Sequence, residues 1–463
     1  MIEQNHISYK DNVARVVCKE KGYYRYIFND YKQEYDHLMN SGLYEELTEK
    51  GHLIKHIETE IDSNDPRVYK LLIPYQIPFI SYPFEWSYIQ WKRAILSYLQ
   101  INKIALKFGM ILKDATPYNF CHLAGKAVLF DTSSFIFFNN NDNWIAYKQF
   151  CEEFFGPVTL MHYNGHEWSN LTMPKMGNVG LEFISRQLPF KSWFNFNVFT
   201  HIHWHSNYVN KSSAKNENKN NGFNIEKIGA IIDMIHHTVN RWKILPNLHS
   251  AWSGYYQNDI EEKSYLQNKE DTINEWLALT KPKTVLDIGA NTGNFSFIAR
   301  EFSERVIAIE PDYSCIDDIE KQIRKNNLEN IFAVVLDITK PSPTLGLMNI
   351  ETENITKRLK SEMVFGLALT HHLYITNKLS FHQIAKMFFG LSSEHIIIEF
   401  IEKGDSKVEF LTRNLILNTA VYTEEFFLNA FNNFFSIVSR RKMKDSARIL
   451  YLLKKKSDVP SHK

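Results

Sequence analysis

Several features that mark common protein classes are absent from this chain of 463 residues. It has four cysteines and no CxxC pair, which argues against a disulfide framework and a cysteine zinc site and fits a reducing compartment. Lys plus Arg number 53 against 52 Asp plus Glu, so net charge gives no reason to expect a nucleic-acid partner. No apolar run approaches the ~20 residues that span a bilayer, and the polar start MIEQNHISYKDNVAR is unlike a secretory signal. We therefore expect a cytoplasmic protein without a membrane span.

The length and composition allow more than one folded domain. Hydrophobic residues make up 44% of the chain, and domains of roughly 100–200 residues predict two or three of them. The clearest break is residues 205–224, HSNYVNKSSAKNENKNNGFN, which has almost no apolar side chains and is predicted to be a linker or loop. The predicted domains are accordingly 1–204 and 225–463.

Strand and helix patterns alternate in the second of these domains. Short apolar runs such as TVLDIG, VIAIEP and HIIIEFI are separated by segments with helical periodicity such as CIDDIEKQIRKNN, which predicts a parallel sheet covered on both faces. The last two strands, FFSIVSRRKM and ARILYLLKK, are joined only by the short turn KDS. The expected fold class is therefore α/β, with a Rossmann-like sheet of seven strands that ends in an antiparallel hairpin.

A glycine-bearing turn follows the first of these strands. Residues 284–296 read TVLDIGANTGNFS, where Gly289 and Gly293 leave room for a ligand and Asn291 stands where a middle glycine often lies. The spacing matches neither GxGxxG nor a GxxxxGK phosphate loop. The turn therefore points away from a dinucleotide or a polyphosphate.

Three carboxylates are placed at the ends of successive strands. Asp287 precedes the first glycine, Glu310 ends the second strand, and Asp337 ends the third. At the carboxyl edge of a parallel sheet such groups face one ligand site. Asp287 would attract a cationic amino-acid moiety, Glu310 would accept hydrogen bonds from a ribose diol, and Asp337 would contact an adenine amine. Three acids suit a cation and a diol better than a polyphosphate.

These elements together resemble the class I S-adenosylmethionine-dependent methyltransferases, over about residues 265–455. The resemblance implies that Asp287, Gly289, Asn291, Gly293, Glu310, Asp337 and Thr370 bind S-adenosyl-L-methionine. A narrower likeness, carried by DITKPSP, LALTHHLYITNKLSFHQIAKMF and DSARILYL, is to a bacterial group that includes a host-specific nodulation methyltransferase-like protein. That group is associated with surface-glycan genes and extends the likeness over most of the chain.

The methyl acceptor is expected beside LALTHHL, after the fourth strand. There Thr370, His371 and His372 would lie near the transferring methyl, and either histidine could act as the general base because its pKa lies near working pH. The alternative is that one histidine caps the strand and the other packs inward. Glu399 is a candidate for the pocket border. Aromatic residues of AWSGYY (Trp252, Tyr255, Tyr256) are either pocket or core.

The first domain carries a second pattern, ILKDATPYNFCHLAGKAVLFDTSSF. It resembles the catalytic region of protein-kinase-like phosphotransferases, with Asp114 as base and Asn119 and Asp131 as magnesium ligands. The departures are that no Gly-rich loop or VAIK-like strand is visible, and DTS stands where DFG is expected. We therefore predict an N-terminal α+β, degenerate kinase-like domain, and leave open an active kinase and a plain domain in which Asp114 and Asn119 cap turns.

Two sets of basic residues in the first domain could hold a ligand. Lys19, Lys21 and Arg25 are candidates for a phosphate-clamping residue by position only. In THIHWHS, His201, His203 and His205 would share one face of a strand, but no fourth ligand is evident. No metal is therefore expected.

The leading functional prediction is a methyltransferase acting on an oxygen or nitrogen of a small molecule or glycan, with no nucleic-acid partner. Two alternatives remain. One is a bifunctional protein whose first half is a phosphotransferase, and the other is a non-catalytic binding protein with a methyltransferase fold.

Overall fold

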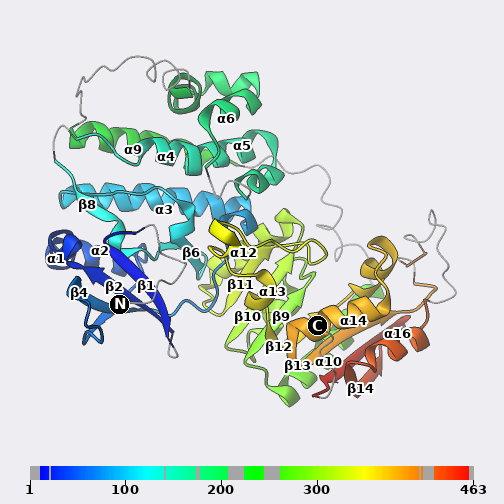
Figure 1. Cartoon of the computed structure of the whole chain (residues 1–463). Coiled ribbons are helices and arrows are strands. Elements are labelled where there is room, and N and C mark those ends of the chain that lie inside the picture. The colour runs from blue at the N-terminus through cyan, green and yellow to red at the C-terminus, as the bar shows by residue number, and fades with distance from the viewer. Residues whose placement is uncertain are drawn as a thin grey trace. The chain divides into compact units, whose positions relative to one another are not determined.

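The computed structural model describes residues 11–19, 22–139, 142–173, 178–206, 224–243, 261–405, 408–409 and 422–457. The chain divides into two compact units (Figure 1). Unit 1 comprises residues 1–248 and 344–352, and unit 2 comprises 249–343 and 353–463. The chain therefore leaves unit 2 after Pro343, contributes a short segment to unit 1, and returns to unit 2 at Glu353.

Unit 1 begins with a four-stranded antiparallel sheet in the order β1-β2-β4-β3. Its strands are β1 (Ala14–Lys19), β2 (Gly22–Phe28), β3 (His56–Thr59) and β4 (Val68–Pro74), and between β2 and β3 lie α1 (Lys32–Asn40) and α2 (Leu43–Glu49). Lys19 pairs with Gly22 in the register of β1 and β2, so only two residues connect these strands. Apolar side chains on both faces of the sheet are buried.

A long buried helix follows the sheet in unit 1. It is α3 (Tyr88–Lys107), which begins at a capping box formed by Ser87 and Gln90. After it come two small antiparallel pairs: β5 (Met110–Leu112) with β8 (Phe135–Phe137), and β6 (Phe120–Leu123) with β7 (Lys126–Leu129). The α-helices that the structure describes after these pairs are α4 (Tyr147–Phe150), α5 (Gly156–Asn164), α6 (Leu181–Gln187), α7 (Phe196–Val198) and α9 (Ile225–Arg241), with π-helical turns at Cys151–Phe155 and Phe199–Trp204.

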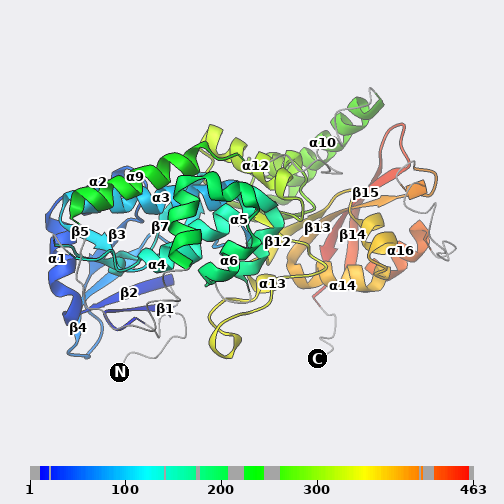
Figure 2. The ribbon, with the colours of Figure 1, turned by 90° about the horizontal axis from the view of Figure 1, so that it is seen from above.

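Helix α9 packs beside α3 (Figure 2). Its apolar stripe of Ile228, Ile232, Ile235 and Val239 joins the core around α3, because residues three and four apart share one helix face. The observed division therefore falls later in the sequence than the expected boundary at 205–224. Residues 207–223 of that segment lie outside the described residues.

The stretch with three histidines is helical and does not form a strand. Within the π-helical turn Phe199–Trp204, His203 stacks on Trp193 with ring centroids 4.2 Å apart. Nδ1 of His201 lies 2.6 Å from the hydroxyl oxygen of Tyr147. Among the residues that the structure describes, no group of three His, Cys, Asp or Glu side chains is placed to hold a metal ion. These histidines pack and hydrogen-bond within the domain because their helical path turns them toward different neighbours.

Unit 2 is built on a seven-stranded sheet in the order β11-β10-β9-β12-β13-β15-β14. The strands are β9 (Thr284–Ile288), β10 (Arg305–Glu310), β11 (Ile331–Val335), β12 (Ser361–Gly366), β13 (Ser392–Ile401), β14 (Phe435–Lys442) and β15 (Arg448–Lys455). The first five are parallel, and β15 is antiparallel to both β13 and β14. The predicted sheet with its antiparallel final hairpin is confirmed.

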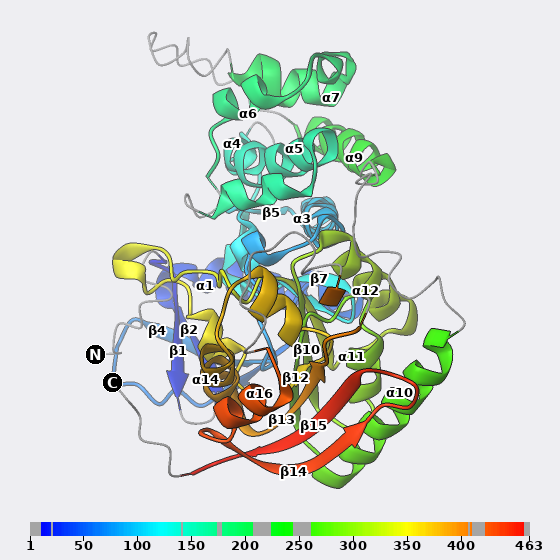
Figure 3. The ribbon, with the colours of Figure 1, turned by 90° about the vertical axis from the view of Figure 1, so that its right-hand side faces the viewer.

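Helices cover both faces of this sheet (Figure 3). They are α10 (Glu261–Thr280), α11 (Asn294–Ala299), α12 (Tyr313–Asn326), α13 (Ile355–Arg358), α14 (Phe381–Leu391) and α16 (Glu424–Phe431). Helices α10, α11 and α12 share one core with alternate residues of the strands, as a period of two in the strands requires. Among the described helices none is long and apolar enough to cross a membrane.

The geometry of the glycine turn after β9 predicts that a side chain at Gly293 would destabilise the protein. Gly293 has φ of 87°, and a Cβ there would lie 2.9 Å from Cγ1 of Ile319. We expect Gly293→Ala to lower the free energy of unfolding by about 1–3 kcal/mol, from strain at positive φ and from overpacking. Thermal or urea unfolding measures this change.

The control is Gly390→Ala. Gly390 lies in α14, where a Cβ would meet nothing within 4 Å. Alanine there should stabilise the protein by up to about 1 kcal/mol, because glycine is a poor helix former. Equal effects of the two substitutions would contradict the assigned turn.

Candidate functional site

The carboxyl edge of the unit 2 sheet brings the first two predicted acids to the same turn. Asp287 lies in β9, and its Oδ2 accepts a hydrogen bond of 2.6 Å from Ser296 Oγ at the start of α11. Glu310 ends β10, where Oε2 accepts from the backbone N–H of Asn291 at 3.0 Å and Oε1 from that of Asp312 at 3.1 Å. Glu310 therefore stabilises the turn that follows Asp287.

The turn itself depends on residues that tolerate a left-handed backbone. Gly289, Asn291 and Gly293 have φ of 74°, 49° and 87°, and Asn is among the few side chains that adopt this region readily. A Cβ on Gly289 would lie 3.5 Å from Cδ1 of Leu369. Leu369, in the turn after β12, therefore packs close to the glycine turn.

Burial shifts both acids toward the protonated form. Asp287 is 2% exposed, and burial raises its pKa to about 6 although Ser296 and Lys269 oppose the shift. Burial likewise raises the pKa of Glu310 to about 7, against the two backbone N–H groups whose hydrogen bonds it accepts. Perturbed carboxyl groups at the edge of a parallel sheet are typical of a ligand site.

Asp337 is placed differently from the other two acids. Strand β11 ends at Val335, so Asp337 lies two residues beyond it and not in it. Its Oδ1 accepts hydrogen bonds from the backbone N–H and hydroxyl of Thr339 at 2.9 and 2.7 Å, and Lys340 Nζ is 3.5 Å from Oδ2. The side chain stabilises its own turn while remaining partly exposed.

The acceptor-side residues follow β12 in a tight turn. The Thr370 hydroxyl donates to the backbone oxygen of Glu399 at 2.8 Å. His371 is fully buried, His372 is partly exposed, and their ring centroids lie 4.1 Å apart. Cofactor binding by Thr370 and catalysis by His371 or His372 remain predictions. The aromatic residues Trp252, Tyr255 and Tyr256 lie outside the described residues.

A network of buried charges lies beside the turn that follows β12, and the sequence patterns did not predict it. Glu399, in β13, accepts hydrogen bonds from Lys269 Nζ, Tyr265 OH and the Ala368 N–H, each at 2.6 Å. The network places Glu399 in the core behind the turn, with none of its side chain exposed. The sequence signal that could have indicated it is a lysine on the apolar stripe of α10, at four-residue spacing from Tyr265 and Ile273.

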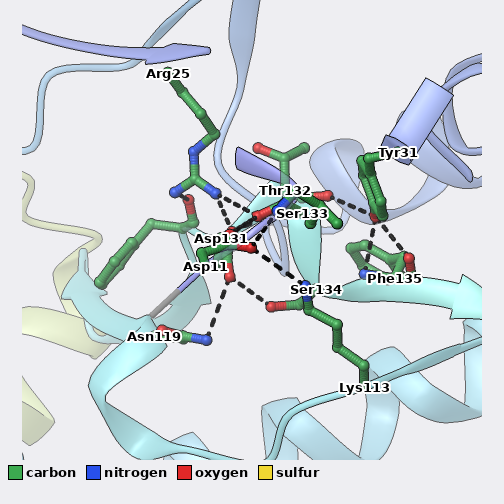
Figure 4. Close-up of polar contacts among 12 residues, drawn as sticks. Asp11, Arg25, Tyr31, Lys113, Asn119, Asp131, Thr132, Ser133, Ser134 and Phe135 are labelled. Atoms are coloured by element: carbon green, nitrogen blue, oxygen red, sulfur yellow. Dashed lines mark hydrogen bonds and ion pairs between the residues drawn. The ribbon is translucent and has the colours of Figure 1, made fainter. Parts of the chain in front are cut away.

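In unit 1, Asp131 lies at the centre of a separate cluster of polar contacts (Figure 4). Arg25 of β2 donates through NH1 to Oδ1 of Asp131, and through NH2 to the backbone oxygen of Phe130 at 3.1 Å. The same Oδ1 accepts from the backbone N–H of Ser133 at 3.0 Å, and Oδ2 accepts from the Ser134 hydroxyl at 2.7 Å. Both oxygens of Asp131 are thus already bonded within the chain.

Asn119 and Asp131, the two expected magnesium ligands, lie near each other, with Asn119 Nδ2 3.5 Å from Asp131 Oδ2. Burial would raise the pKa of Asp131, but the Arg25 guanidinium and the neighbouring serines hold it well below its usual range. Asp114 lies on the loop between β5 and β6, where burial raises its pKa. A guanidinium therefore lies on the carboxylate expected to bind magnesium.

Comparison with known proteins gives one relative over most of the chain. It is the nodulation protein NoeA of Rhizobium meliloti (strain 1021), 26% identical over 382 residues that cover 80% of this chain and 79% of the relative. A 23S rRNA (uracil(1939)-C(5))-methyltransferase, RlmD of Marinomonas sp. (strain MWYL1), is 26% identical over 89 residues, 19% of this chain and 20% of that protein. No family model matches.

Among solved structures, the N-methyltransferase NodS from Bradyrhizobium japonicum WM9 in complex with S-adenosyl-L-homocysteine is 12% identical. It matches 43% of this chain and 93% of its own, with a TM-score of 0.32. The fold assignment rests on strand order and direction. A parallel sheet that ends in an antiparallel hairpin, with a glycine turn after β9 and an acid ending β10, is the arrangement that the sequence predicts from its resemblance to the class I methyltransferases.

The raised pKa of Glu310 predicts that the stability of the protein depends on pH. Protonated Glu310 contributes to the free energy of unfolding in full below pH 4.5, its pKa in the unfolded chain, and this contribution is lost as the pH rises through about 7. Relative to Glu310→Gln, the ligand-free wild type should therefore lose on the order of 2–3 kcal/mol of unfolding free energy between pH 5 and pH 8.5. Urea unfolding at the two pH values measures the difference. A gap between wild type and variant that is independent of pH would contradict the assignment.

Proposed function

We propose that unit 2 is an S-adenosylmethionine-dependent methyltransferase acting on an oxygen or nitrogen of a small-molecule or glycan acceptor. The observation that carries the proposal is the pair of buried acids, Asp287 and Glu310, on either side of a turn with three left-handed residues. Within the described part of the chain neither acid forms an ion pair with a basic side chain, whereas Glu399 does. A cationic ligand would supply the missing charge.

The residues fit this cofactor chemically. Each oxygen of Glu310 accepts one backbone N–H, and a carboxylate oxygen has about two acceptor sites. Glu310 therefore retains acceptor capacity for both hydroxyls of a ribose. Asp287 would hold the positively charged amino-acid end of the cofactor. When bound, S-adenosylmethionine would supply an electrophilic methyl group on a sulfonium.

The chain would contribute orientation and a proton acceptor. Thr370 is fixed on Glu399, and His371 and His372 follow it directly, so both rings stand at a restrained turn at the carboxyl edge of the sheet. His372 is the more exposed of the two. We favour it as the base that removes a proton from the acceptor, because the base must reach the acceptor. Much of the remaining rate would come from alignment.

The net charge of the chain and its likeness to known proteins support a small-molecule or glycan acceptor. The net charge of +1 gives no electrostatic footprint for nucleic acid. The RlmD likeness covers 19% of the chain, and we retain a small-molecule or glycan acceptor. NoeA is named as a nodulation protein, and the association of the resembling group with surface-glycan genes supports a glycan.

Isothermal titration of the full-length protein with S-adenosylmethionine tests the proposal. We expect binding whose affinity increases from pH 6 to pH 8, because Asp287 and Glu310 must be charged to hold the cofactor and their pKa values are about 6 and about 7. Asp287→Asn and Glu310→Gln should each weaken binding at pH 8 by about tenfold or more, the loss of one charged hydrogen bond. Absence of binding by the wild type would end the proposal.

For unit 1, we propose a kinase-like arrangement that does not transfer phosphate. The order of its elements supports the likeness: a sheet with two helices, then α3, the Asp114–Asn119 loop, the β6–β7 hairpin and Asp131. Three observations argue against catalysis. The first is that two residues connect β1 and β2, too few to cradle phosphates. The second is that both carboxylate oxygens of Asp131 already accept hydrogen bonds within the chain. The third is that the Arg25 guanidinium donates to one of those oxygens.

Thermal melting of the full-length protein tests this second proposal. Magnesium with ATP should leave the melting temperature unchanged. Arg25→Met should destabilise the protein by about 3–5 kcal/mol, because Asp131 would keep a buried charge without its partner. Lys32→Met, which breaks an exposed pair with Asp36, is the control and should barely move the melting temperature, because exposed ion pairs contribute little. A magnesium-dependent ATP shift that Asp131→Asn removes would show that Asp131 takes part in binding magnesium and ATP, and would contradict this proposal.

A further inference from the structure

The Glu399 network connects segments that are distant in sequence within unit 2. Lys269 and Tyr265 come from α10, Glu399 from β13, and Arg448 from β15, with Arg448 NH1 3.6 Å from Glu399 Oε1. Burial alone would raise the pKa of Glu399, but the Lys269 ammonium and Arg448 guanidinium lower it to about 2. The carboxylate is therefore charged over the whole range in which the protein would act.

Glu399 holds the turn after β12 on both sides of Leu369. Ala368 has a left-handed φ of 49°, an uncommon conformation for a residue with a side chain, and its N–H donates to Glu399 Oε2 at 2.6 Å. Thr370 donates its hydroxyl to the backbone oxygen of Glu399 at 2.8 Å. The side chain and the main chain of one residue thus fix the two neighbours of Leu369.

Leu369 in turn reaches the glycine turn on the other side of the site. A Cβ on Gly289 would be in van der Waals contact with Leu369 Cδ1, at 3.5 Å. Strands β9 and β12 are neighbours, with Asp287 opposite Phe365, so the turns that follow them lie side by side at the sheet edge. The position of Leu369 therefore limits the space above Gly289.

Lys269 joins the same network to the glycine-turn side. Its ammonium lies 4.8 Å from the centre of the Phe295 ring in α11, the helix that follows the glycine turn. It also lies close enough to Asp287 to favour the charged form of that acid and so lower its pKa. One buried cation therefore contacts the carboxylate that holds the β12 turn and the helix that holds the glycine turn.

We propose that the Glu399–Lys269 pair is a positioning device that sets the spacing between the glycine turn at 289–293 and the turn at 367–372. This inference rests on the proposed function, because that spacing determines how tightly unit 2 holds S-adenosylmethionine. A buried ion pair is seldom the most stabilising choice, since apolar residues of similar volume often serve as well. The hydrogen bond that its carboxylate accepts from the left-handed Ala368 N–H gives it a role that apolar residues cannot fill.

The experiment separates stability from cofactor affinity in the full-length protein. The variant Lys269→Met/Glu399→Leu removes both charges and the acceptor of the Ala368 N–H, whereas Lys269→Met/Glu399→Gln keeps one oxygen that can accept it. Both are measured by urea unfolding and by titration with S-adenosylmethionine. We expect the Glu399→Leu double variant to remain folded and to bind at least about tenfold more weakly than wild type, and the Glu399→Gln double variant to recover part of that loss.

The matched control removes another ion pair from the same helix. Glu275 of α10 binds Arg441 of β14 through two hydrogen bonds of 2.7 and 2.9 Å; Glu275 is exposed and Arg441 is partly exposed. Glu275→Gln/Arg441→Met should leave the affinity for S-adenosylmethionine unchanged. A loss equal to that of the buried-pair variants would overturn the inference.

A single substitution tests the same inference if the double variants do not fold. Leu369→Ala leaves the network intact and removes the side chain that limits the space above Gly289, so it should weaken S-adenosylmethionine binding by several-fold with the protein still folded. Wild-type affinity in Leu369→Ala, or in a folded Lys269→Met/Glu399→Leu protein, overturns the positioning role while leaving the methyltransferase proposal standing. Absence of binding by the wild type removes both.

Discussion

The organisation of unit 2 depends on burying carboxylates at the carboxyl edge of a parallel sheet. Removing a carboxylate from water is costly unless a partner compensates. Asp287 and Glu310 have a hydroxyl and backbone N–H groups as partners, and those donors do not offset the cost, so both acids hold protons more tightly than usual. The left-handed turn between them follows from the same constraint, because it directs the Asn291 N–H at Glu310.

Four buried acids among the described residues fall into two pairs, which differ in the direction of their pKa shifts. Glu399 and Asp131 each have a buried cation, Lys269 or Arg25, and their pKa values fall. In Asp287 and Glu310 the pKa values rise. A fully compensated carboxylate connects elements of the fold and gains little from a ligand. An incompletely compensated one gains from a cation or a set of hydroxyl donors, which is why the proposed cofactor site lies at the second kind.

Local sequence patterns predicted the parts of the structure that local physics determines. The strands of unit 2, the glycine turn and the acid ending β10 could be predicted because each depends on residues close together in the chain. Pairings at long range could not. Arg25 and Asp131 are 106 residues apart, and Lys269 and Glu399 are 130 apart, so no spacing announces them. Asp337 was assigned to a strand because LDI continues the apolar run, whereas its own side chain bonds to Thr339 and turns the backbone. The histidines at 201–205 alternate as in a strand, but they lie in a helical segment packed on Trp193 and Tyr147.

The crossing of the chain between its units has a consequence for how such a protein could be divided or recombined. Residues 344–352 belong to unit 1 although they lie between β11 and β12 of unit 2. A cut near residue 248 would therefore leave the fragment that contains unit 2 carrying nine residues whose packing partners are on the other fragment. Exchange of either half between relatives by a single fusion point would face the same mismatch. The two halves are therefore expected to be inherited as one piece.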